Sequence, residues 1–77
     1  MELKSGILFD FSNKQYYVHD IMKHEGNDYL VAIEYSNPKV VEVFAYKFSG
    51  DVFMVKKIDD EEIIRDILFA SLQKTVA

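Results

Sequence analysis

The chain has 77 residues, of which 49% are hydrophobic and 14% aromatic, with 13 acids against 9 bases for a formal net charge of -4. This length predicts a single domain over residues 1–77, because two cores would each be too small to offset the entropy lost on folding. The absence of cysteine excludes disulfide scaffolds and thiolate metal sites, and the negative charge argues against general binding to a phosphate backbone.

Five β-prone segments, separated by turn-forming residues about every ten positions, predict an antiparallel meander. The predicted strands cover residues 7–11, 15–24, 29–35, 40–48 and 52–58. The residues between them form turns readily, since Ser12 and Asn13 can bond the local backbone and Pro38 cannot join a ladder. We expect two-residue turns at Gly26-Asn27 and at Gly50-Asp51.

The C-terminal segment, residues 58–74, is predicted to be a helix. Its apolar residues recur at steps of three and four and form one stripe: Ile63, Ile64, Ile67, Leu68 and Leu72. Asp59 is the expected N-cap, with Glu62 three residues further on as in a capping box. The acidic residues at this end interact favourably with the positive end of the helix dipole. The segment lacks the glycine of a calcium-binding loop, so helix capping explains these acids better than a metal site does.

The predicted fold class is α+β, an antiparallel β-meander of about five strands with one C-terminal α-helix packed on one face. Side-chain alternation then collects the large residues on one face: Val18, Met22, Tyr29, Val31, Ile33, Tyr35, Phe44, Tyr46, Phe48, Phe53 and Val55. We expect the helix to lie on this face, over Val31, Ile33, Phe44 and Tyr46. A one-residue bulge would exchange the two faces.

The opposite face carries apolar residues that one helix leaves uncovered. They form a candidate interaction surface: Ile21, Leu30, Ala32, Val41, Val43, Ala45 and Met54. This surface, or an exposed edge strand, is predicted to contact an unknown protein partner or a second copy of the chain. The alternative is a monomer with a modestly apolar face.

No group of residues indicates catalysis, a metal site or a cofactor, so the expected function is a small non-enzymatic interaction or regulatory module. His19 and His24 have an odd separation and point to opposite faces of a strand. The three glycines are isolated and form no phosphate-binding loop. Nucleic-acid binding through Lys23, Lys47 and Lys56 on the mixed face remains an alternative.

Residues 1–6 lack a basic region followed by an apolar run, and no stretch approaches the roughly 20 apolar residues of a membrane span. We therefore expect a cytoplasmic protein without a membrane partner.

Three segments carry a resemblance to a known family: residues 26–32 (GNDYLVA), 43–46 (VFAY) and 58–64 (IDDEEII). With them, the chain from about Ile7 to Leu72 resembles a bacterial family catalogued only as domain-of-unknown-function family 1292. The resemblance implies a small meander that ends in a helix, and it implies no activity or catalytic residues. The chain departs from the family at residues 36–39, where an acidic loop is expected, and its helix has fewer glutamates.

Overall fold

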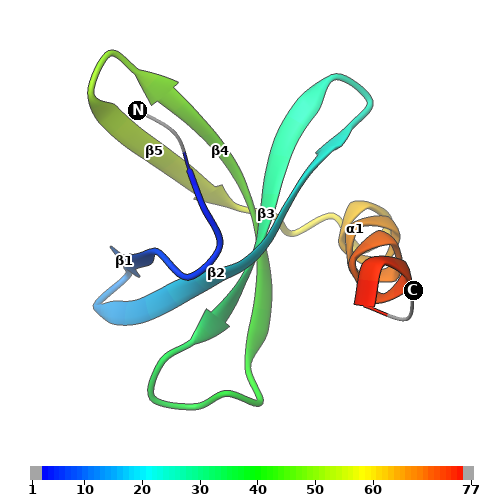
Figure 1. The fold of residues 1–77 in the computed structure, drawn as a ribbon, viewed down its shortest axis with the longest axis horizontal. Coiled ribbons are helices and arrows are strands. Elements are labelled where there is room, and N and C mark those ends of the chain that lie inside the picture. Colours follow the sequence, from blue (N-terminus) through cyan, green and yellow to red (C-terminus); the bar gives the residue numbers. More distant parts are fainter. Residues whose placement is uncertain (1–2, 76–77) are drawn as a thin grey trace.

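The computed structural model describes residues 3–75, which form one antiparallel sheet and one helix. The elements are β1 (Leu8–Phe11), β2 (Lys14–His24), β3 (Asn27–Glu34), β4 (Val41–Ser49), β5 (Val52–Lys57) and α1 (Glu61–Thr75). Strands that follow one another in the chain are neighbours in the sheet, and the helix comes after the last strand (Figure 1). The predicted α+β meander is confirmed.

Tight turns join three of the four strand pairs. In the turns at residues 12–13 and 25–26, both central residues have a positive φ. This is the backbone conformation of a two-residue turn whose twist matches that of the flanking strands. The turn between β2 and β3 is therefore one residue earlier than the predicted turn at residues 26–27. The turn at residues 50–51 lies where it was predicted.

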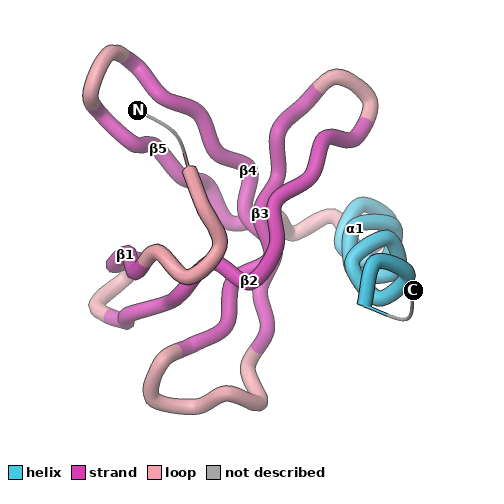
Figure 2. Tube along the Cα trace, in the orientation of Figure 1, coloured by secondary structure: helices cyan, strands magenta, loops and turns pink. Residues whose placement is uncertain are grey.

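The sheet is strongly curled, and its hairpins splay outward from a shared centre (Figure 2). One cause is a bulge in β2, where pairing with β3 shifts between Val18 and Asp20 and leaves His19 as the extra residue. Pairing between β3 and β4 also ends at Tyr29 and Ala45, although both strands continue beyond that pair. The result is an open half-barrel with β1 and β5 at its two edges.

The concave side of the sheet holds one of two apolar clusters, which we call the inner cluster. Its buried members are Tyr16, Val18, Leu30, Ala32 and Phe44. The Phe44 ring is fully buried, and its centroid lies 5.4 Å from that of Phe9, 5.0 Å from that of Phe11 and 5.4 Å from that of Tyr16. These edge-to-face contacts tie β1 and β2 to β4.

The second cluster lies between the sheet and α1, and we call it the helix-side cluster. Its buried members are Tyr29, Val31, Val43 and Ile67, with Met22, Ala45, Ile58, Ile63, Ile64 and Leu68 packed around them. The predicted helix bed is wrong in part, because Phe44 and Tyr46 belong to the inner cluster. The reason is the register of β3 against β4, which pairs Val31 with Val43 and so places Phe44 on the opposite side.

α1 begins at Glu61, and its N-cap lies one residue later than predicted. The carboxylate Oδ1 of Asp60 accepts hydrogen bonds from the backbone N–H of Glu62 at 2.9 Å and of Ile63 at 3.4 Å, so Asp60, and not Asp59, is the N-cap. Four residues of the predicted stripe face the sheet, whereas Leu72 is 63% exposed. Within residues 3–75, no helix is long and apolar enough to cross a membrane.

Candidate functional site

The seven residues of the predicted interaction surface do not form one open face. Leu30 and Ala32 are fully buried in the inner cluster, and Ile21 packs against it. Val43 and Ala45 belong to the opposite side, beneath the helix. The prediction of a single surface is therefore wrong, because the β3–β4 register places residues assigned to one face on both sides of the sheet.

Two of the seven residues remain exposed, Val41 and Met54. Val41 lies at the start of β4, beyond the area that α1 covers. Met54 lies in the middle of β5, a strand at the edge of the sheet. An exposed edge strand is the other contact surface predicted from the sequence, and β5 is such a strand.

The backbone hydrogen-bonding groups of β5 alternate between the two sides of the strand. The two-residue turn at residues 50–51 makes Ser49 and Val52 a hydrogen-bonded pair, and further along Ile58 N–H donates to the Val43 carbonyl at 3.0 Å. Even-numbered residues therefore turn their N–H and C=O groups toward β4. The odd-numbered residues turn these groups away from the sheet: Phe53, Val55 and Lys57.

Within the described residues, 3–75, no strand pairs with this outer side of β5, residues 52–57, which we call the open edge. Among residues 3–75 no Cα atom of β1 lies within 8 Å of one in β5, although the rings of Phe9 and Phe53 meet across the gap with their centroids 5.8 Å apart. Beside the unpaired groups, Val52 is 60% exposed and Met54 is 44% exposed. The open edge thus combines free backbone groups with an apolar flank.

Opposite charges stand at the two ends of the open edge. Asp51 lies in the turn before β5 and is exposed, and Lys57 ends the strand. The Lys57 Nζ atom is 3.4 Å from Glu42 Oε2, and 45% of the Lys57 side chain remains exposed. The Lys57 side chain belongs to the concave side of the strand, as do those of Phe53 and Val55, because all three residues are odd-numbered in β5.

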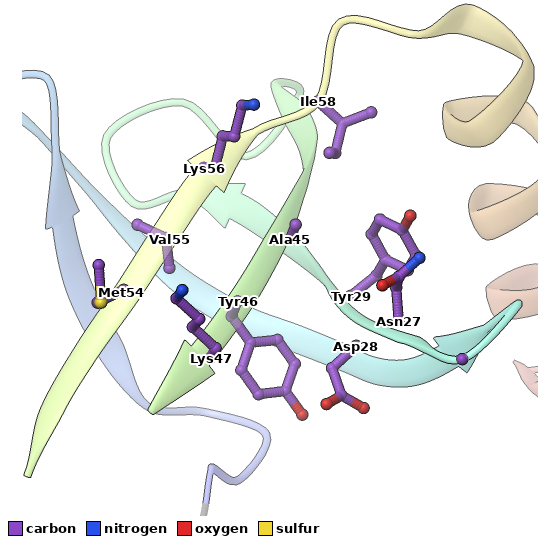
Figure 3. Close-up of a pocket in the computed structure, with 11 residues that line it drawn as sticks. Asn27, Asp28, Tyr29, Ala45, Tyr46, Lys47, Met54, Val55, Lys56 and Ile58 are labelled. Carbon is purple, nitrogen blue, oxygen red and sulfur yellow. The ribbon is translucent and has the colours of Figure 1, made fainter. Parts of the chain in front are cut away.

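A groove separates the β2–β3 hairpin from the β4–β5 hairpin (Figure 3). It opens where pairing between β3 and β4 stops, so that Asp28 and Tyr46, the next two residues in register, are held apart. Its volume is about 610 Å³, and its lining includes Tyr29, Ala45 and Val55.

The chemistry of this groove is mixed. In Figure 3 the Tyr46 hydroxyl points toward the Asp28 carboxylate. Burial raises the pKa of Tyr46 above its ordinary value, and the negative charge of Asp28 raises it further. Two lysines, Lys47 and Lys56, also line the groove.

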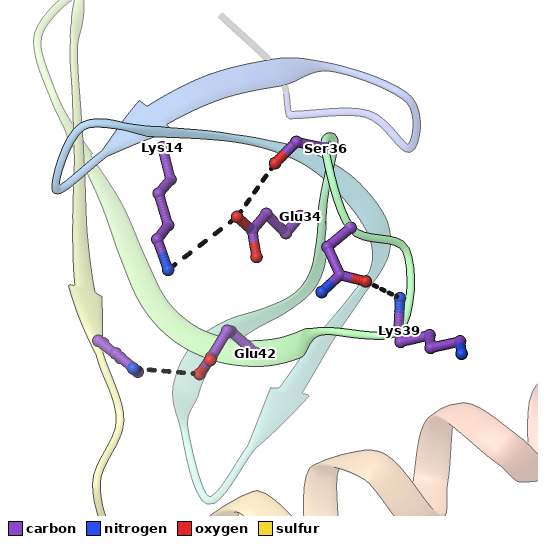
Figure 4. A network of polar contacts seen from close by, with 7 residues as sticks. Lys14, Glu34, Ser36, Lys39 and Glu42 are labelled. Carbon is purple, nitrogen blue, oxygen red and sulfur yellow. Dashed lines mark hydrogen bonds and ion pairs between the residues drawn. The ribbon is translucent and has the colours of Figure 1, made fainter.

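Among the residues that the structure describes, one carboxylate is buried, that of Glu34, which is 7% exposed (Figure 4). Its Oε1 atom accepts a hydrogen bond from the Ser36 hydroxyl at 3.2 Å and lies 4.0 Å from Lys14 Nζ. These contacts join the β3–β4 loop to the start of β2 and provide the charge with polar neighbours. We assign Glu34 a structural role.

The two histidines lie apart in the fold. His19 is the exposed bulge residue of β2, and His24 Nε2 lies 3.8 Å from Asp66 Oδ2 on the helix. In the part of the chain that the structure describes, no three His, Asp or Glu side chains gather into a set that could hold a metal ion.

Comparison with known proteins identifies no relative: no protein family, no curated protein and no solved structure matches the chain. The resemblance to domain-of-unknown-function family 1292 stays a prediction. The open edge of β5 is the candidate site that the geometry of the chain itself provides.

Proposed function

We propose that this chain is a small, non-enzymatic protein-interaction or regulatory module that acts through the open edge of its sheet. The observation that carries the proposal is the unpaired outer side of β5 beside the exposed side chains of Val52 and Met54. An extended partner segment that adds a strand here would gain main-chain hydrogen bonds, and the apolar flank would select its side chains.

The distribution of charge along β5 supports the same proposal. Natural proteins block exposed edge strands with lysine, proline, bulges or covering loops. In β5 the only charged residues are Lys56 and Lys57, at its C-terminal end, and residues 52–55 contain neither charge nor proline. The greater part of this edge therefore lacks the features that prevent strand addition.

The cytoplasmic location and the family membership expected from the sequence remain part of this proposal. Both concern the setting of the module, and neither bears on the geometry of the edge.

Chemical synthesis gives a direct test, because the chain has 77 residues and a single backbone amide can be methylated. N-methylation of Val55 would block an outward N–H at the centre of the open edge without removing a bond to β4. A displayed library of random peptides, selected against the unmodified chain, should yield extended peptides that lose binding to the N-methyl-Val55 chain.

The matched control is N-methylation of Asp10, whose N–H points outward from β1 at the other edge of the sheet, because Phe11 and Lys14 pair across the tight turn. Selected peptides should bind this chain as they bind the unmodified one. Peptides that bind all three chains equally would contradict the proposal. So would tight binding of single-stranded RNA that weakens steeply with salt, because it would favour the nucleic-acid alternative.

A further inference from the structure

We infer that the occupant of the open edge is a second copy of this chain, paired antiparallel, β5 against β5, about a two-fold axis at Met54. The inference rests on the proposed function and names the partner of the same site. It would extend the sheet across two molecules and cover the apolar flank of each.

Symmetry restricts the registers that such a pair can adopt. In a two-fold antiparallel pair, the two residues of each cross-strand pair have their side chains on the same face of the sheet. The residues that form hydrogen bonds must be the odd-numbered ones, whose backbone groups point away from β4, so an odd-numbered residue must lie opposite another odd-numbered residue. The axis must therefore pass through a residue of β5 and not between two residues. With the axis at Met54, Phe53 lies opposite Val55 of the second copy, and the two residues exchange both of their hydrogen bonds.

Charge selects this register among the allowed ones. With the axis at Met54, Asp51 lies opposite Lys57 of the second copy, and the same pair forms again at the other end. An axis at Val55 instead places Asp51 opposite Asp59 of the second copy, and an axis at Lys56 places two lysines against each other. Opposite charges stabilise a cross-strand pair and like charges destabilise it.

The exposed apolar side chains also find partners in this register. Met54 meets Met54 of the second copy at the axis, and Val52 lies opposite the aliphatic part of Lys56 of the second copy. Val52 and Met54 are the two large apolar side chains of β5 that the single chain leaves exposed.

The test is sedimentation velocity over a hundredfold range of protein concentration, with reciprocal charge variants. The unmodified chain should shift from monomer to dimer as concentration rises. Asp51→Lys and Lys57→Asp should each raise the dissociation constant about tenfold or more, because each places like charges at both ends of the pair. The double variant D51K/K57D should restore the dissociation constant toward that of the unmodified chain.

Thermal unfolding of each variant controls for folding, since Lys57 also neighbours Glu42. If Lys57→Asp fails to fold, Met54→Lys replaces it, because that substitution puts two cations together at the axis. It should weaken the dimer without disturbing the core, given that Met54 is exposed.

Three outcomes would overturn the inference, and they separate it from the proposed function. A chain that stays monomeric at every concentration would exclude self-pairing, while edge-dependent peptide binding would still support strand addition by another partner. A dimer whose double variant is no better than the single variants would exclude this register. A dimer unaffected by N-methylation of Val55 would exclude the open edge as the dimer interface, while the peptide-binding test would still decide the proposed function.

Discussion

The two apolar clusters on either side of the sheet are built differently. The inner cluster draws buried residues from β2, β3 and β4, and rings from β1 and β5 pack against it. The helix-side cluster depends on one fully buried helix residue, Ile67, set against two central strands. The inner cluster therefore ties the two edge strands to the centre of the curled sheet, whereas the helix covers the back of its central strands. The curl brings the rings of Phe9 and Phe53 together but does not close the sheet, so within residues 3–75 β1 and β5 do not pair and the open edge remains.

Removing the centre of the inner cluster should have the largest effect. Phe44→Ala should lower the free energy of unfolding by about 3–5 kcal/mol, because it leaves a cavity among three aromatic rings. Denaturant unfolding measures this loss. Phe69→Ala is the matched control, since Phe69 is 61% exposed on the helix and its removal should change stability by less than about 0.5 kcal/mol. Equal losses for the two variants would contradict the assignment of the core.

The helix-side cluster should tolerate truncation better. Ile67→Ala should cost about 2–5 kcal/mol, and less than Phe44→Ala in the same assay, because fewer elements meet at Ile67. Ile67→Asp should prevent docking of the helix and unfold the domain, since it buries a charge without a partner. Leu72→Ala, at an exposed position, is the control and should melt like the parent chain. An Ile67→Asp chain that also melts like the parent would show that α1 does not dock.

The start of the helix offers a smaller and more local test. Asp60→Ala should cost about 1 kcal/mol, because it removes the acceptor for two backbone N–H groups. Asp59→Ala removes the neighbouring acid without removing the cap, so it should have little effect. The reverse order of the two effects would restore the N-cap expected from the sequence.

The smallest expected effect lies at the rim of the inner cluster, at Tyr46. Its raised pKa means that the folded chain holds the phenol proton more tightly than the unfolded chain does. The resulting stability is fully present below the ordinary value of 10.0 and is lost as the pH rises through the pKa of the folded state. Asp28→Asn should lower the pKa of Tyr46 by part of the shift, because burial is the larger cause. NMR titration of the Tyr46 ring measures it, and an unchanged pKa would exclude the influence of Asp28.

The elements of this fold could be predicted from the sequence, because their signals are local. Turn residues such as Asn13, Gly26 and Gly50 mark where strands end, and the spacing of Ile63, Ile64 and Ile67 marks a helix with one apolar stripe. These signals depend on residues close together in the chain.

The faces of the sheet could not be predicted in the same way, because register is not a local property. Asn37 accepts a hydrogen bond from the backbone N–H of Lys39 and shapes the β3–β4 loop. No residue type in that loop, however, specifies which residue of β4 pairs with Val31. The bulge at His19 has no glycine to mark it. A one-residue difference in register then moved Phe44 from the predicted helix bed to the inner cluster.

Amide hydrogen exchange at low and high protein concentration tests the central claim most directly. The amides of Met54 and Lys56 point toward β4 and should exchange slowly at both concentrations. The amides of Phe53 and Val55 should exchange fast in dilute solution and become protected in concentrated solution, as a second copy pairs with the open edge. Fast exchange of Phe53 and Val55 at both concentrations would contradict self-pairing, and slow exchange in dilute solution would show that the edge is not open.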